Sequence, residues 1–155
     1  MSAPADLHIR SVHQDDFAAW KPLWDDYNAF YGRAGETGLP DIVTQTTWQR
    51  FFDETEPVHA LVAERGGELL GIVHFLYHRS TTQIGMSCYL QDLFTAQAAR
   101  GQGVGRALIE AVYRRAQADG LPRVYWQTHE TNATAMRLYD TLADKSGFVV
   151  YRKLF

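Results

Sequence analysis

The chain opens with a short alternating stretch and then changes to helical periodicity. Residues 7–12 alternate apolar and polar positions, which predicts a strand. Aromatic residues then recur at helical spacing over residues 17–31, where Pro22 predicts a kink or a break. Glycines over residues 31–41 predict a loop, and residues 44–54 have the pattern of a second, shorter helix.

Strand-like runs occupy the middle of the chain. Residues 58–64 and 68–78 lie on either side of Gly66-Gly67, an arrangement that predicts a β-hairpin. Residues 87–95 have the apolar and aromatic composition of a further strand. The first half of the chain therefore predicts a largely antiparallel sheet.

Helix and strand alternate over the remainder. An amphipathic helix ends at Asp119-Gly120, residues 122–128 predict a strand, residues 133–145 a last helix, and residues 147–155 a closing strand. The order β-α-α-β-β-β-α-β-α-β predicts an α/β (α+β) fold. Its mixed central sheet should have about six strands, flanked by about four helices.

Composition and charge narrow the class of protein. The chain has 155 residues, 46% hydrophobic and 21% charged, which predicts one domain over residues 1–155. Its net charge of −3 argues against a surface built for nucleic acid or anionic membrane. No apolar run approaches the roughly 18–20 residues of a membrane span, and the N-terminus lacks the apolar core of a signal peptide. With Cys88 as the only cysteine, we expect a cytoplasmic protein.

Metal and thiol chemistry are the weaker interpretations. His74 and His78 would chelate at this spacing on a helix, but their run predicts a strand, in which four residues span about 13 Å. His129 lacks the second histidine of a zinc-protease motif. Nothing in the sequence pairs Cys88 with a base. We therefore expect neither a metal site nor a cysteine nucleophile.

A glycine-rich loop precedes the amphipathic helix. Gly101, Gly103 and Gly105 alternate with larger residues, and Arg100 and Arg106 flank them. Glycine lets the backbone approach a ligand closely, and a helix N-terminus offers unpaired N–H groups and a positive dipole end. The combination predicts a site for phosphate groups. The spacing fits neither a Walker loop nor a dinucleotide-binding fingerprint.

The second half of the chain resembles one known family. The segment "RGQGVG" at residues 100–105 is similar to the [QR]-x-x-G-x-[GA] signature of the GNAT family, the Gcn5-related N-acetyltransferases. Asn132, Ala135 and Tyr139 resemble the family's N-x-x-A-x-x-x-Y helix, and "GFVVYRK" its closing strand. The strand "YLQDLF" looks like that of Hpa2-like and diamine acetyltransferases. The resemblance covers nearly the whole chain and is strongest over residues 89–151.

The resemblance implies an acetyl-CoA-dependent N-acetyltransferase. A primary amine would attack the thioester directly in a ternary complex, and a small amine, a polyamine, an amino acid or a lysine side chain can be the acceptor. The pantetheine arm would pair with the fourth strand, which needs that strand to diverge from the fifth, commonly through a bulge. The positions implied for acetyl-CoA lie on the fourth strand, the loop and the last helix: Leu93, Phe94, Thr95, Arg100, Gly101, Gln102, Gly103, Val104, Gly105, Arg106, Asn132 and Ala135.

Two proton transfers define the catalytic candidates. An alkyl amine must lose a proton before attack, and the departing thiolate gains one. Tyr139 occupies the family's general-acid position. Some relatives have a glutamate where this chain has Gln91, which cannot take a proton, so the adjacent Asp92 becomes a candidate base if a bulge re-aims it. Glu130, His129 and a water relay are alternatives.

Aromatic residues suggest where the acceptor binds. Tyr27 and Tyr31 lie on one stripe of the first helix, next to a glycine-rich loop, and aromatic walls suit an ammonium group. Gln91, Trp126 and Gln127 are expected to line the same cavity.

Partners and rival functions follow from the same resemblance. Relatives of this kind often form homodimers, and an unpaired sheet edge near the C-terminus predicts a homodimer through that region. The main alternative function is a non-catalytic CoA-binding sensor or regulatory module. A GNAT-fold enzyme with a longer acyl donor, and one that acetylates proteins, are further alternatives.

Overall fold

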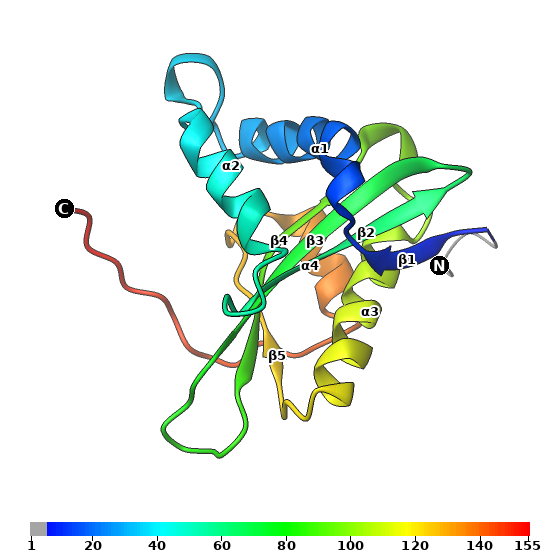
Figure 1. Ribbon diagram of the computed structural model, residues 1–155. Helices are drawn as coiled ribbons and strands as arrows, with labels where there is room; N and C mark the ends of the chain where they lie inside the picture. The colour runs from blue at the N-terminus through cyan, green and yellow to red at the C-terminus, as the bar shows by residue number, and fades with distance from the viewer. Residues whose placement is uncertain (1–5) are drawn as a thin grey trace.

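Strands and helices follow the expected order as far as the last helix in the computed structural model, which describes residues 6–155 (Figure 1). The strands are β1 (His8–Ser11), β2 (Val58–Arg65), β3 (Glu68–His78), β4 (Ser87–Thr95) and β5 (Val124–Tyr125). The helices are α1 (Phe17–Phe30), α2 (Asp41–Arg50), α3 (Val104–Ala118) and α4 (Ala133–Tyr139). Short 3₁₀ turns precede the first three helices: Gln14–Asp16, Gly35–Thr37 and Gln97–Ala99.

The strands form one mixed sheet in the order β1-β2-β3-β4-β5. Strands β1 to β4 pair antiparallel, and β4 pairs in parallel with β5. Both β3 and β4 have the predicted bounds, and Gly66 and Gly67 form the predicted hairpin turn with φ of 60° and 83°. The predicted α+β fold class is confirmed.

Helices cover both faces of the sheet. On one face α1 and α2 bury an aromatic cluster that includes Trp20, Trp24 and Tyr27. On the other face α3 buries Leu108 and Ile109, as its periodicity predicts, and α4 packs at the edge of the same cluster. In Figure 1 the helices α1 and α2 lie above the sheet and α3 lies below it.

Strand β3 passes very close to the first turn of α3 at Gly71. A Cβ atom at this position would lie 2.9 Å from Val104 Cγ1 and 3.0 Å from both Leu108 Cδ1 and the Phe94 carbonyl oxygen. Real Cβ atoms essentially never approach other atoms so closely, so the packing requires glycine. The absent side chain lets the N-terminus of α3 settle against β3 and β4.

Three predicted element boundaries are corrected by the structure. Pro22 neither breaks nor ends α1, because the buried Trp20 and Trp24, stacked 5.6 Å apart, hold the helix against the sheet on either side of it. The strand predicted over 122–128 is reduced to Val124–Tyr125, which pairs with only two residues of β4. Helix α4 ends at Tyr139 instead of near residue 145, where the chain tightens into i→i+3 turns: Thr141 N–H donates to the Leu138 carbonyl and Leu142 N–H to the Tyr139 carbonyl.

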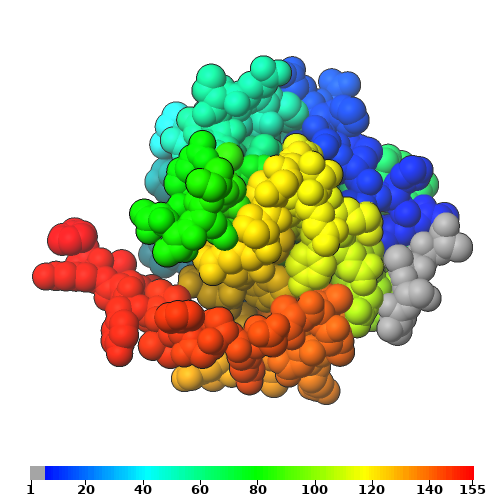
Figure 2. Space-filling view, turned by 90° about the horizontal axis from the view of Figure 1, so that it is seen from below, coloured from blue at the N-terminus to red at the C-terminus, as the bar shows by residue number. Residues whose placement is uncertain are grey.

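The C-terminal segment is the largest difference from the sequence prediction. Residues 147–155 form no strand in the described part of the chain, so the sheet has five strands and the sixth is missing. Their apolar side chains are open to solvent, with Phe148 and Tyr151 each 92% exposed. Figure 2 shows this segment in red, extending away from the body of the molecule. The short β5 offers too little ladder to hold it, and the outer edge of β5 stays open.

Candidate active site

A β-bulge in β4 marks the candidate site. His74 of β3 pairs with Asp92, whereas the next residue, Phe75, pairs with Leu90, so Gln91 is an extra residue in β4. An extra residue shifts the alternation of side chains by one position. As a result Leu90 joins the cluster under α3, while Asp92 points to the face that α1 covers. This bulge re-aims Asp92 as the sequence analysis required.

The Asp92 side chain is held by buried polar neighbours. His74 Nδ1 lies 2.9 Å from Asp92 Oδ2, and Trp20 Nε1 donates to His74 Nε2 over 3.0 Å. Burial, followed by the negative charge of Asp92 and a hydrogen bond to it, raises the pKa of Tyr27. The Tyr27 hydroxyl therefore stays protonated beside the carboxylate. The Asp92 side chain keeps 11% of its surface exposed, which leaves an edge that a ligand can reach.

Strand β4 separates from β5 at the bulge. The two strands pair only at Cys88–Val124 and Tyr89–Tyr125. Beyond Tyr89, β4 has a neighbour on the β3 side alone within residues 6–155. Alternation from the Ala96–Leu70 bond turns the main-chain groups of Leu93 and Thr95 away from β3, whereas those of Phe94 between them face β3. This unpaired edge can accept a further strand-like partner.

The glycine-rich loop leads from this edge into α3. Gly101 and Gly103 have φ of 75° and 83°, a region that side-chain-bearing residues rarely adopt, and Gly103 is the N-cap of α3. No side chain in the described part of the chain caps this helix, so its first N–H groups remain available to an anion. A Cβ at Gly105 would make only ordinary contacts, the nearest at 3.6 Å, so packing does not require glycine there.

Charged and polar side chains anchor the loop on both sides. Arg100 Nε donates to the Thr95 carbonyl over 3.2 Å, which ties the loop to the end of β4. Gln102 Oε1 accepts from Arg65 Nη1 over 3.0 Å. Arg106 Nη2 donates to Thr141 Oγ1 over 2.7 Å, which links α3 to the end of α4. Three arginines therefore surround the open N–H groups, and their charge favours a phosphate ligand.

Helix α4 supplies the other wall. The Tyr139 ring packs edge-on against Trp126, with ring centroids 5.4 Å apart. Burial, and to a lesser degree the neighbouring Tyr31 hydroxyl, raises the pKa of Tyr139. Asn132 is the N-cap residue of α4, but its side chain donates to Thr128 Oγ1 instead of capping the helix.

The other residues predicted for the site differ in their exposure to solvent. Gln91 and Gln127 are exposed, and Trp126 is half-buried beside Tyr139. Of the alternative bases, His129 and Glu130 are both exposed in the turn before α4. Asp92 is the buried carboxylate among these candidates, and it alone is held by a histidine.

Two features of the site were missed from the sequence. For His74 the sequence suggests a metal ligand or, more simply, an ordinary surface or core histidine, and it does not reveal that Nδ1 lies 2.9 Å from Asp92 Oδ2. Arg33 was not considered at all. Its guanidinium carbon lies 5.4 Å from the Tyr31 ring centroid and 6.0 Å from that of Tyr27, and its Nε donates to Asn28 Oδ1 over 2.7 Å. The adjacency of Arg33 to the tyrosine stripe in "FYGR" was the available signal.

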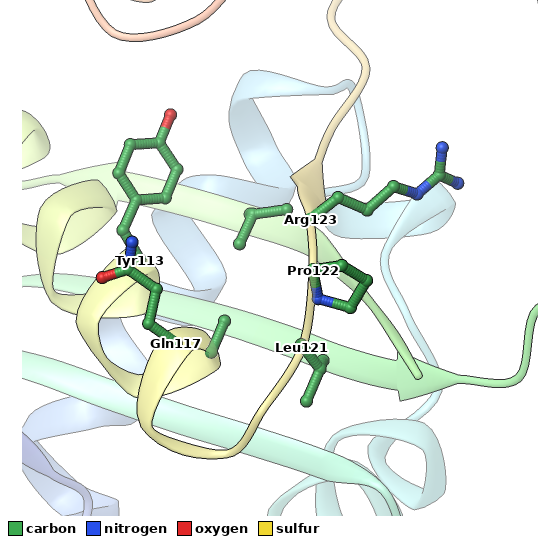
Figure 3. Close-up of a pocket in the computed structure, with 7 residues that line it drawn as sticks. Tyr113, Gln117, Leu121, Pro122 and Arg123 are labelled. Carbon is green, nitrogen blue, oxygen red and sulfur yellow. The ribbon is translucent and has the colours of Figure 1, made fainter. Parts of the chain in front are cut away.

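Two cavities lie away from these residues. One of about 120 Å³ is open between α3 and the start of β5, with Tyr113 and Gln117 on one side and residues 121–123 on the other (Figure 3). A second, of about 250 Å³, lies on the outer face of α2. Neither is lined by a predicted site residue. Within residues 6–155 no three potential ligand side chains cluster to hold a metal ion, and no helix is long and apolar enough to cross a membrane.

Comparison with known proteins identifies the family. The sequence profile of the acetyltransferase (GNAT) family matches residues 20–143. The D-amino-acid N-acetyltransferase HPA3 of Saccharomyces cerevisiae is 35% identical over 147 residues, which cover 94% of this chain and 89% of HPA3. The thialysine N-epsilon-acetyltransferase of Bos taurus is 35% identical over 98 residues, 59% of this chain and 58% of that protein. The chain belongs to the GNAT family and is an N-acetyltransferase, which confirms the resemblance.

Solved structures share the fold. The aminoglycoside N-acetyltransferase AAC(6')-Iy, in complex with the bisubstrate analogue CoA-S-monomethyl-acetylneamine, matches with a TM-score of 0.80 at 16% identity. The match covers 96% of this chain and 98% of that chain. At this identity the likeness is one of fold.

Proposed function

We propose that this enzyme transfers the acetyl group of acetyl-CoA to a primary amine by direct attack in a ternary complex. The bulge at Gln91 carries the proposal. The bulge has two consequences. It lies where β4 separates from β5, and it turns the Asp92 carboxylate toward the face of the sheet that α1 covers. The separated strand edge suits a donor with a long extended arm, and the Asp92 carboxylate suits an acceptor with a positive charge.

The donor site follows β4, the glycine-rich loop and α3. The uncapped N-terminus of α3 suits the pyrophosphate, and the free edge of β4 suits the pantetheine arm. Asn132 and Ala135 of α4 face the same region in this assignment. The residues assigned to acetyl-CoA are Leu93, Phe94, Thr95, Arg100, Gly101, Gln102, Gly103, Val104, Gly105, Arg106, Asn132 and Ala135.

In the proposed reaction the amine nitrogen loses two protons and the CoA sulfur gains one. Asp92 takes a proton from the ammonium group, directly or through water, and the neutral nitrogen attacks the thioester carbon. As the C–N bond forms, the nitrogen releases its second proton to solvent. The C–S bond then breaks, and Tyr139 gives its hydroxyl proton to the CoA thiolate before solvent reprotonates it. The raised pKa of Tyr139 keeps this proton in place at neutral pH.

The oxyanion that forms on the thioester carbon needs a donor. A backbone N–H of Leu93 or Phe94 is assigned to it, and the register favours Leu93, whose N–H lies on the free edge of β4 while that of Phe94 faces β3. Loss of one such donor typically costs about 3–4 kcal/mol of barrier.

The acceptor is proposed to be an amine that also carries a carboxylate, as an amino acid does. Arg33 supports this class, because its cation lies over the rings of Tyr27 and Tyr31, and the charge of Asp92 helps to raise the pKa of Tyr27. The name of HPA3, a D-amino-acid N-acetyltransferase, supports the same class. Aromatic and polar side chains would surround the acceptor: Tyr27, Tyr31, Gln91, Trp126 and Gln127.

Calorimetric titration with acetyl-CoA tests the donor site. Gly103→Asp introduces a side chain and a negative charge at the N-cap of α3 and should abolish binding. Gly120→Asp is the matched control, since Gly120 has nearly the same φ, 80° against 83°, but lies beyond the other end of α3. Equal loss in both variants would contradict the assignment. Binding by wild type without CoA release for any amine would favour the sensor alternative.

Paired acceptors test the acceptor class. Alanine and alaninamide, in both enantiomers, differ in the carboxylate alone. Arg33→Gln should lower kcat/KM for alanine about tenfold or more, because a hydrogen-bonded ion pair is lost, and leave alaninamide unaffected. Arg79→Gln, in the β3–β4 loop, is the control. Equal effects on acid and amide would remove Arg33 from acceptor recognition.

A homodimer through the C-terminal region is also proposed. Exposed apolar side chains of residues 147–155, the open edge of β5 and the cavity beside it support a second copy of the chain as the partner. A cytoplasmic location stays a prediction.

A further inference from the structure

Three elements meet in a buried polar chain that ends on Asp92. Trp20 of α1 is fully buried, and the side chains of His74 on β3 and Asp92 on β4 are 2% and 11% exposed. Trp20 Nε1 donates to His74 Nε2, and His74 Nδ1 contacts Asp92 Oδ2. Each of these polar atoms is therefore paired, as burial demands.

The direction of these hydrogen bonds follows from the donor at one end. An indole N–H can only donate, so His74 Nε2 must accept and carries no proton. The ring proton therefore lies on Nδ1, which donates to Asp92 Oδ2. Which nitrogen of a histidine carries the proton is commonly fixed by the bond that the other nitrogen makes. One oxygen of Asp92 is thus held by the imidazole, and the Tyr27 hydroxyl is the other polar neighbour of the carboxylate.

We propose that His74 positions Asp92 for proton transfer and that the indole N–H of Trp20 sets the His74 tautomer that does so. This inference rests on the proposed role of Asp92. A satisfied core histidine would also explain the paired atoms, but it does not explain the bulge. Without the bulge, regular alternation from Leu90 would pair His74 with Gln91 and turn Asp92 to the α3 face, away from His74.

The surroundings of His74 isolate it from other charges. Trp20 and Trp24 of α1 and Phe51 at the end of α2 surround the ring, with centroids between 4.8 and 5.8 Å away. None of the three titrates. Asp92 is the ionisable group in direct contact with His74. Tyr27 is next to Asp92, and the Arg33 guanidinium lies over the Tyr27 ring. Asp92 is therefore the charged partner of the His74 imidazole.

The tautomer is tested on the wild-type protein. Long-range ¹H–¹⁵N spectra of protein labelled at histidine distinguish a proton on Nδ1 from one on Nε2, and loss of one signal set in His74→Asn assigns the residue among six histidines. At neutral pH we expect Nδ1 to be protonated and Nε2 to be free. A proton on Nε2, alone or with one on Nδ1, would overturn the proposal.

Amide substitutions separate positioning from packing. His74→Asn keeps an N–H donor near the place of Nδ1, whereas His74→Gln puts its amide near the place of Nε2. We expect His74→Gln to lower kcat about tenfold, as for loss of a hydrogen bond to a charged group, with KM for acetyl-CoA unchanged. His74→Asn should restore most of that loss. Equal kcat in the two variants would mean that His74 only packs.

Matched tryptophan variants test the outer link. Trp20→Phe removes the indole N–H that contacts His74, and the spectra should then show His74 no longer confined to the Nδ1–H form. Trp24→Phe removes a neighbouring buried indole N–H, which donates to Thr44 instead, and should leave the tautomer unchanged. An unchanged tautomer in Trp20→Phe would contradict the role of Trp20. If no amine is acetylated, the proposed function fails and the positioning role of His74 fails with it, while the tautomer spectra still decide whether Trp20 sets the His74 tautomer.

Discussion

Residues of opposite chemical character sit on opposite walls of the candidate site. Asp92 on β4 is a carboxylate held by His74, and Tyr139 on α4 is a phenol kept protonated by burial. Their separation along the chain gives no indication that they serve one site. Tyr31, the C-cap residue of α1, is related to both: its ring centroid lies 5.1 Å from that of Tyr27, and its hydroxyl contributes to the raised pKa of Tyr139.

Tyr139→Phe tests the general acid. We expect kcat to fall about 100-fold, the lower part of the range for general acid–base catalysis, with KM for acetyl-CoA little changed. Tyr113→Phe is the control, because it removes a hydroxyl from another tyrosine beside Trp126, one that donates to the Leu142 carbonyl. Steady-state kinetics would argue for a packing role if both variants turned over equally fast.

Cys88 provides a test of direct transfer. It is fully buried in β4, and burial raises the pKa of its thiol to about 12, so the thiol stays protonated and unreactive at neutral pH. We expect Cys88→Ala to retain turnover and the folded wild type to resist iodoacetamide. A burst of CoA release without amine, present in wild type and lost in Cys88→Ala, would instead indicate an acyl-enzyme.

Elements were predictable where periodicity is long and uniform. Strands β3 and β4 match their predicted bounds because their apolar runs end at glycine and polar turns. The bulge could not be predicted, since the string "YLQDLF" alternates equally well with or without an extra residue. The register is fixed by cross-strand partners, His74 and Phe75, which the local sequence does not reveal.

The contact between β3 and α3 gives a test at this scale. Gly71→Ala should lower the free energy of unfolding by about 1–3 kcal/mol, because the added methyl group overpacks the core against Val104 and Leu108. The shifted α3 should also weaken acetyl-CoA binding. In the control Gly85→Ala the added Cβ would lie 3.2 Å from its nearest neighbour, the Gly120 carbonyl oxygen. This variant should lose less stability and less acetyl-CoA affinity than Gly71→Ala. Chemical denaturation and calorimetry measure the two effects, and an undisturbed Gly71→Ala would contradict the packing argument.

At the scale of the whole molecule, the fold and family were predictable and the C-terminal region was not. The glycine loop and the spacing of Asn132 to Tyr139 gave the family, and the chain order gave the architecture. The segment "GFVVYRKLF" has a strand's composition, yet residues 147–155 pair with nothing in the described chain. Composition sets what a strand can do, whereas pairing depends on a partner edge that sequence alone does not supply.

Light scattering tests the proposed homodimer. We expect a mass of about twice 17.6 kDa for wild type, and a monomer when residues 147–155 are removed. Ile84→Ser is the control, because it removes an equally exposed apolar side chain, 96% exposed, from the β3–β4 loop. A monomeric wild type would end the proposal, and a dimeric truncated protein would place the interface elsewhere.

Steady-state CoA release from acetyl-CoA, with mass spectrometry of the acceptor, tests the central claim most directly. Purified enzyme is supplied with acetyl-CoA and a panel of amino acids, polyamines and small amines. The predicted result is amine-dependent CoA release matched one for one by an acetylated amine, with amino acids among the best acceptors. No release with any amine, although acetyl-CoA binds, would contradict the proposed transferase function.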